Sequence, residues 1–126
     1  MARILVVEDE EPVRDFVRRA LELDGHKTIG AGDGGEGLDI LQREAGAIDL
    51  LLTDIRMPVM DGIALALAAA RDFPNIPILL MTGYADQRER ARNLESLIRD
   101  VLVKPFTLAH LRKVVADVLA SAGPRR

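Results

Sequence analysis

Five short runs of Val, Ile and Leu recur along the chain, spaced so that one strand and one helix fit into each repeat, and this recurrence constrains the fold most. Three of the runs are apolar at successive positions, a pattern typical of parallel strands that are buried on both faces. The runs lie at residues 4–7, around 28–29, and at 48–52, 76–81 and 101–103.

Helical patterns fill the intervals between these runs. The first has Pro12 in its opening turn and Gly25 as its stop. We expect a second helix near residues 36–43, a third opened by Asp61, a short or mobile helix within residues 86–100, and a last helix capped by Thr107. Five strand–helix units with right-handed crossovers predict an α/β fold, a doubly wound five-stranded parallel sheet flanked by five helices.

Length and composition limit the possible functions. The 126 residues suit one domain, which we place at residues 1–120, followed by a short flexible tail at 121–126. The absence of cysteine excludes disulfides, thiolate nucleophiles and cysteine-containing zinc sites, and two separated histidines are a poor basis for a metal site or a Ser/His triad. A net charge of −3 predicts no direct nucleic-acid binding. We expect a cytoplasmic protein with no membrane contact, because the sequence begins with no signal peptide and has no apolar stretch of about 20 residues.

Polar residues follow four of the five apolar runs. The carboxyl ends of parallel strands meet at one edge of a doubly wound sheet, where such folds bind their ligands. We therefore expect three carboxylates, one hydroxyl and one ammonium group to share a shallow cleft, from Glu8, Asp9, Asp54, Thr82 and Lys104.

This combination predicts phosphoryl chemistry. Crowded carboxylates repel one another unless a cation lies between them, and oxygen ligands favour Mg²⁺. Such an ion, with Thr82 as a hydrogen-bond donor and Lys104 as a point charge, would stabilise a phosphoryl group, making Asp54 a plausible nucleophile. Each residue alone has a plainer explanation: the acidic pair could favour the start of the next helix, and the other three could simply end strands. The plainer explanations do not account for the meeting of all five residues at one edge of the expected sheet.

Residues 2–120 closely resemble the receiver domains of bacterial two-component response regulators, the CheY-like family. The resemblance rests on the acidic pair before the first expected helix and on three segments in the same order and separation. These segments read LLLTDIRMPVMDG, LLMTGYA and LVKPF. The resemblance implies a flavodoxin-like sheet with strand order 2-1-3-4-5.

The resemblance also implies a role for each site residue. Asp54 would accept a phosphoryl group from a phosphohistidine on a histidine kinase or histidine phosphotransferase. Mg²⁺ would be held by Asp9, Asp54 and the backbone carbonyl of Arg56, while Glu8 would act largely through water. Contact with the phosphoryl oxygens would come from Thr82 and Lys104, and the bond between Lys104 and Pro105 would be cis.

One departure from the family pattern concerns the switch. Many receivers carry an aromatic residue three positions before the lysine, where this chain has Val101, and an aromatic occurs instead at Tyr84. We hypothesise that Tyr84 and residues 86–100 reorganise together on phosphorylation, although Tyr84 could simply be an exposed loop residue. A second hypothesis is that Arg56 and Tyr84 flank the path of attacking water and slow dephosphorylation.

The output of such a domain is harder to predict. Because the sequence ends soon after its fifth expected helix, we expect no effector domain and an output through protein contacts. The motifs are most similar to stand-alone receivers of the CpdR type, which prime the ClpXP protease, so ClpX is an expected partner.

Alternatives are a receiver of a hybrid histidine kinase, a phosphate-sink receiver, an aspartyl-phosphate phosphatase of the haloacid dehalogenase type, or a flavin-binding protein. The phosphatase is disfavoured because Arg56 stands where those enzymes need a second acid. The flavin-binding protein is disfavoured because the sequence has no hydroxyl-rich phosphate loop after its first expected strand.

Overall fold

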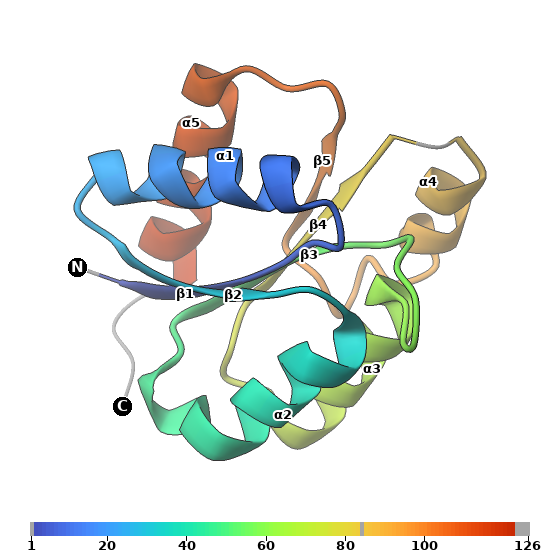
Figure 1. The fold of residues 1–126 in the computed structure, drawn as a ribbon. Helices are drawn as coiled ribbons and strands as arrows, with labels where there is room; N and C mark the ends of the chain where they lie inside the picture. The colour runs from blue at the N-terminus through green and yellow to red at the C-terminus, as the bar shows by residue number, and fades with distance from the viewer. Residues whose placement is uncertain (1, 84, 123–126) are drawn as a thin grey trace.

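The computed structural model describes residues 2–83 and 85–122, which form a five-stranded parallel sheet with helices on both faces (Figure 1). The strand order is β2-β1-β3-β4-β5, and every neighbouring pair is parallel, as the sequence predicts. The elements are β1 (Arg3–Val7), α1 (Glu11–Leu23), β2 (Lys27–Ala31), α2 (Gly34–Glu44), the 3-10 turn η1 (Ala45–Ala47), β3 (Leu50–Asp54), α3 (Gly62–Asp72), β4 (Ile78–Thr82), α4 (Ala85–Arg92), β5 (Asp100–Val103) and α5 (Leu108–Ala122).

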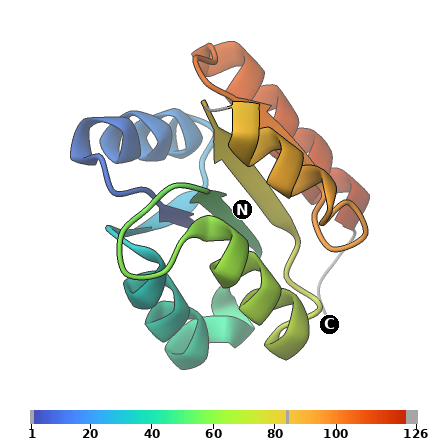
Figure 2. The same ribbon diagram turned by 90° about the vertical axis from the view of Figure 1, so that its right-hand side faces the viewer.

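Alternate residues of the central strands point into two separate hydrophobic cores, one on each face of the sheet. Leu5 and Val7 point to the face that α2, α3 and α4 cover, whereas Ile4 and Val6 point to the face that α1 and α5 cover. Figure 2 shows these two helical layers on either side of the sheet. β3 and β4 are buried along their whole length, which explains their continuous apolar runs.

Several element boundaries differ from the sequence prediction. β3 begins at Leu50 and β4 at Ile78, so the apolar residues Ile48 and Ile76 are buried outside the strands. α5 continues through Ala122 and includes the first two residues of the predicted tail, while residues 123–126 lie outside the described part of the chain. Within residues 2–83 and 85–122, no helix combines the length and apolar character needed to cross a bilayer.

The segment after β4 forms a short helix, as predicted, followed by turns. α4 consists mostly of charged residues. Among its side chains that the structure describes, residues 89–92, Ala91 packs into the core, and Leu94 does so just beyond the helix. Leu97, in the turns that follow α4, is 43% exposed.

Candidate functional site

The carboxyl ends of the strands place the five polar residues at one edge of the sheet, where Glu8, Asp9, Asp54 and Lys104 lie close together. Glu8 and Asp9 follow β1, Asp54 ends β3, Thr82 ends β4, and Lys104 follows β5. Three of them, Asp9, Asp54 and Lys104, line a cleft of about 440 Å³ at this edge of the sheet. The lining residues of the cleft are Asp9, Glu10, Val13, Asp54, Arg56, Gly83 and Lys104.

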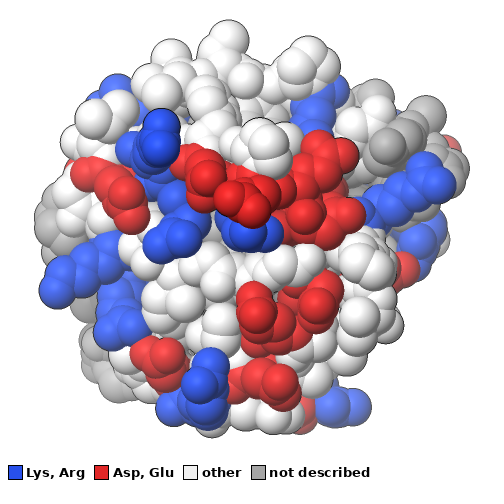
Figure 3. All heavy atoms as spheres, in the orientation of Figure 1, with Lys and Arg blue, Asp and Glu red and all other residues white. Residues whose placement is uncertain are grey.

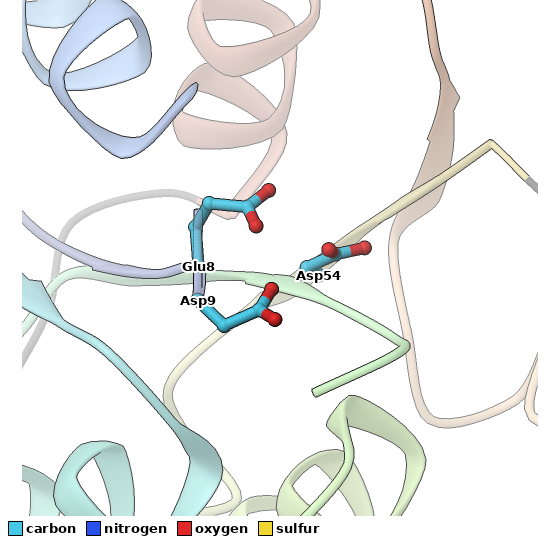
Figure 4. Close-up of side chains that lie close together, drawn as sticks. All are labelled: Glu8, Asp9 and Asp54. Carbon is cyan, nitrogen blue, oxygen red and sulfur yellow. The ribbon is translucent and has the colours of Figure 1, made fainter. Parts of the chain in front are cut away.

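Three carboxylates, those of Glu8, Asp9 and Asp54, lie close together at this edge of the sheet (Figure 4). One oxygen from each of Glu8, Asp9 and Asp54 lies within 4.8 Å of the others. Glu8 and Asp54 are buried, whereas Asp9 is exposed at the mouth. Partial desolvation, together with the hydrogen bond and charge of Glu8, raises the pKa of Asp9 despite the opposing effect of its backbone hydrogen bond and of Lys104. The cluster thus carries unfavourable repulsion that a cation would relieve.

Lys104 neutralises part of this charge. Its Nζ atom donates to Glu8 Oε1 at 2.7 Å and to Asp54 Oδ2 at 3.1 Å. Partial burial disfavours the charged ammonium, but the hydrogen bonds and charges of Glu8 and Asp54 outweigh it and raise the pKa of Lys104. The backbone N–H of Lys104 donates to the Thr82 carbonyl at 2.8 Å, and the Lys104–Pro105 bond is cis, as the resemblance implies.

A close approach between β3 and α3 holds the backbone of Asp54. A Cβ atom at Gly62 would lie 2.0 Å from the Asp54 carbonyl oxygen, so only glycine fits there. The Asp61 carboxylate caps α3 by accepting from Ala64 N at 2.9 Å. In addition, Ile55 N donates to Asp54 Oδ1 at 2.9 Å. The Asp-Gly pair of the motif therefore fixes the loop that presents Asp54.

The composition of the cluster suits a hard divalent cation. All the ligand atoms it offers are carboxylate oxygens, which Mg²⁺ prefers. Acidic side chains also gather across the face that Figure 3 presents, with Lys and Arg side chains beside them.

The structure places the remaining predicted residues in different environments. Thr82 is buried at the end of β4, and the exposed Arg56 lines the cleft. Val101 is half-buried on β5 beside α4, and Tyr84 lies outside the described residues. Sequence reasoning missed Glu10 and Val13 as cleft residues. Glu10 lies just before α1, and Val13 lies in its first turn. Their position directly after the acidic pair could have predicted that they line the cleft.

Comparisons with known proteins agree with this geometry. A family model for the response regulator receiver domain matches residues 4–116. The chain belongs to the response regulator receiver family. The receiver fold recurs in a solved receiver domain from Clostridium thermocellum, with a TM-score of 0.88, 26% identity and 96% of each chain covered.

Curated relatives of this receiver domain include two kinds of signalling protein. The sensor kinase CckA of Brucella abortus is 36% identical over 119 residues, which cover 94% of this chain and 12% of the kinase. The response regulator MprA of Mycobacterium avium is 36% identical over 122 residues, which cover 97% of this chain and 53% of the regulator. The receiver domain therefore spans about half or less of these relatives.

Proposed function

We propose that this receiver domain is the phosphoryl-accepting switch of a two-component phosphorelay that works in the cytoplasm. The observation that carries the proposal is the convergence of Glu8, Asp9 and Asp54 within 4.8 Å, with Lys104 bridging two of them. In the proposal, Asp54 accepts the phosphoryl group from a phosphohistidine of a histidine kinase or histidine phosphotransferase. Its only catalysis is its own phosphorylation and dephosphorylation.

Each residue has a defined part in the proposed transfer. One oxygen of Asp54 forms the new P–O bond, while the donor P–N bond breaks and its electron pair returns to the imidazole nitrogen. Asp9, Asp54 and the Arg56 carbonyl would hold Mg²⁺, with Glu8 acting through water. The bound ion supplies positive charge that offsets the repulsion between carboxylates and phosphoryl oxygens. Lys104 then turns from its carboxylate partners toward the phosphoryl oxygens, where Thr82 donates a hydrogen bond.

Labelling by a small phosphodonor tests this proposal. Incubation with phosphoramidate and MgCl₂ is expected to add one phosphoryl group to the wild type, located at Asp54 by mass spectrometry of borohydride-reduced peptides. Asp54→Ala is the matched control and should remain unlabelled. Chelation of Mg²⁺ with EDTA should suppress labelling of the wild type. Modification at another residue, or equal labelling with EDTA, would contradict the proposal.

The exposed Arg56 side chain at the cleft supports a further part of the proposal, that it obstructs attack by water on phosphorylated Asp54. After removal of the donor, Arg56→Ala is expected to lose its phosphoryl group faster than the wild type. An unchanged lifetime would refute this role. The parallel role for Tyr84, and its joint movement with residues 86–100, stay predictions from the sequence.

The output has two candidate forms. The chain could switch contacts as a stand-alone regulator, including the CpdR-type adaptor role at ClpX that its motifs suggest. The likeness to a segment of a sensor kinase favours the alternative, a receiver within a hybrid histidine kinase or a phosphate sink. Binding of purified ClpX to Asp54→Ala, and its loss on phosphorylation of the wild type, would support the adaptor. Phosphotransfer to a histidine phosphotransferase without ClpX binding would support the relay.

A further inference from the structure

The two adjacent acids of the cluster require an unusual backbone path. In a continuous strand Glu8 and Asp9 would point to opposite faces of the sheet. Instead, both carboxylates approach Asp54, and the chain bends at Asp9 and Glu10 directly after β1 (Figure 4). The orientation of the peptide group between Glu8 and Asp9 therefore decides whether the two acids can converge.

The side chain of Arg14 holds that peptide group. Its Nη1 atom donates to the Glu8 carbonyl oxygen at 2.8 Å. Because the peptide unit is planar, fixing this oxygen also fixes the direction in which the chain leaves toward Asp9. On the other side, Glu8 N donates to the Ala31 carbonyl at 3.0 Å, which anchors the same residue to β2.

Arg14 also holds the far end of the bend. Its backbone N–H donates to the Glu10 carbonyl at 2.9 Å, the first hydrogen bond of α1. The half-buried side chain crosses β2 where glycines leave room. A Cβ atom at Gly30 would lie 3.4 Å from Arg14 Cδ, and one at Gly32 would lie 3.5 Å from Arg14 Nη1. One residue thus binds both ends of the segment that carries Asp9.

We propose that Arg14 is a positioning residue for the cation site, acting through the Glu8–Asp9 peptide without touching the cation or the phosphoryl group. This inference rests on the proposed function, because it assigns a purpose to the convergence of the acids. Partners that orient metal ligands contribute about 10- to 100-fold to metal affinity. Because Arg14 contributes one hydrogen bond to a backbone carbonyl, we expect its loss to lower the Mg²⁺ affinity by about tenfold, the lower end of this range.

The same helix offers a matched control one turn further on. Arg18 packs against Gly30 as Arg14 does, but its Nε atom donates to Thr28 Oγ1 at 3.0 Å and not to the acidic loop. Arg18→Met therefore removes a similar side chain and the same charge from the same face of α1. A difference between Arg14→Met and Arg18→Met isolates the hydrogen bond to Glu8.

The experiment titrates ¹⁵N-labelled protein with MgCl₂ in the absence of phosphodonor and follows the backbone amide signals of the cleft. Arg14→Met is expected to weaken Mg²⁺ binding about tenfold, while Arg18→Met binds like the wild type. Arg14→Lys should weaken it less, because the ammonium can still donate to the Glu8 carbonyl. Where Arg14→Met does not fold, Arg14→Lys carries the test with an expected loss of about threefold.

The outcomes separate this inference from the proposed function. Equal Mg²⁺ affinity in the wild type and in both Arg14 variants overturns the role of Arg14 alone. Equal weakening in Arg14→Met and Arg18→Met also overturns it, because the effect would then come from α1 in general. A wild type that neither binds Mg²⁺ nor accepts a phosphoryl group at Asp54 overturns both.

Discussion

Replacing Lys104 by methionine removes the ammonium that neutralises the buried end of the acidic cluster and keeps a side chain of similar length. Glu8 is fully buried, and the Lys104 side chain is 24% exposed, so this pair is shielded from solvent. Removing one partner of a buried pair typically costs about 3–5 kcal/mol, because the other charge is left without compensation. Because Lys104 forms ion pairs with both Glu8 and Asp54, at 2.7 and 3.1 Å, we expect the cost of Lys104→Met to fall within this range.

Proton uptake sets an upper limit on this cost. Neutralising an ordinary carboxyl group at pH 7 requires about 4 kcal/mol, since its pKa is near 4 and each pH unit corresponds to about 1.4 kcal/mol. One carboxyl group of the cluster can therefore take up a proton once the repulsion exceeds that value. We expect Lys104→Met to lower the free energy of unfolding at pH 7 by about 3 kcal/mol.

A double-mutant cycle measures the interaction directly. Urea unfolding in EDTA is recorded for the wild type, Lys104→Met, Glu8→Gln and the double variant. The double variant should recover at least about 2 kcal/mol relative to the sum of the two single losses, because the fully buried Glu8 charge is then removed together with its ammonium partner. Adding MgCl₂ should restore part of the stability of Lys104→Met. A loss below about 1 kcal/mol in Lys104→Met, or additive effects in the cycle, would refute the reasoning.

Two further predictions concern the loop between β3 and α3. The Asp61 carboxylate caps α3 and forms an ion pair with Arg90 at 2.9 Å. Partial burial raises the pKa of Asp61, but the hydrogen bonds from Ala64 and Arg90 outweigh this effect and lower the pKa below 3.8. Asp61→Ala should lose about 1–1.5 kcal/mol and Asp61→Asn, which keeps a cap, about 0.5 kcal/mol. Both losses of stability should be constant above pH 3.8 and should diminish as the pH falls through the folded-state pKa of Asp61, because the carboxylate stabilises the fold only while it is ionised. A loss of stability that grows as the pH falls would contradict this prediction. Val59 has a φ of 70° and is 86% exposed, so Val59→Gly should relieve strain and raise the free energy of unfolding by about 0.5–1 kcal/mol in denaturant titrations. Val59→Ala, which keeps the strain, should give no such gain, and equal stability of the two variants would contradict the assignment.

The alternation of strands and helices was predictable because each signal is local. Continuous apolar runs predicted β1, β3 and β4, which are buried on both faces. The capping residues Asp61 and Thr107 were also predictable, since a side-chain oxygen at a helix start satisfies a nearby backbone N–H. Strand ends were less predictable: Ile48 and Ile76 are as apolar as their neighbours, and only the pairing of backbones shows that the strands begin later.

By itself, the sequence determined which side chains reach the functional edge, because parallel strands all end on the same side of the sheet. Glu8, Asp54 and Lys104 could be assigned to one cleft on that ground alone. Tertiary structure decided how they meet, with Lys104 bridging Glu8 and Asp54 and with Arg14 holding the carbonyl of Glu8. These contacts depend on the packing of α1 and of the loop after β5 over the sheet, and no pattern along the chain specifies such distances.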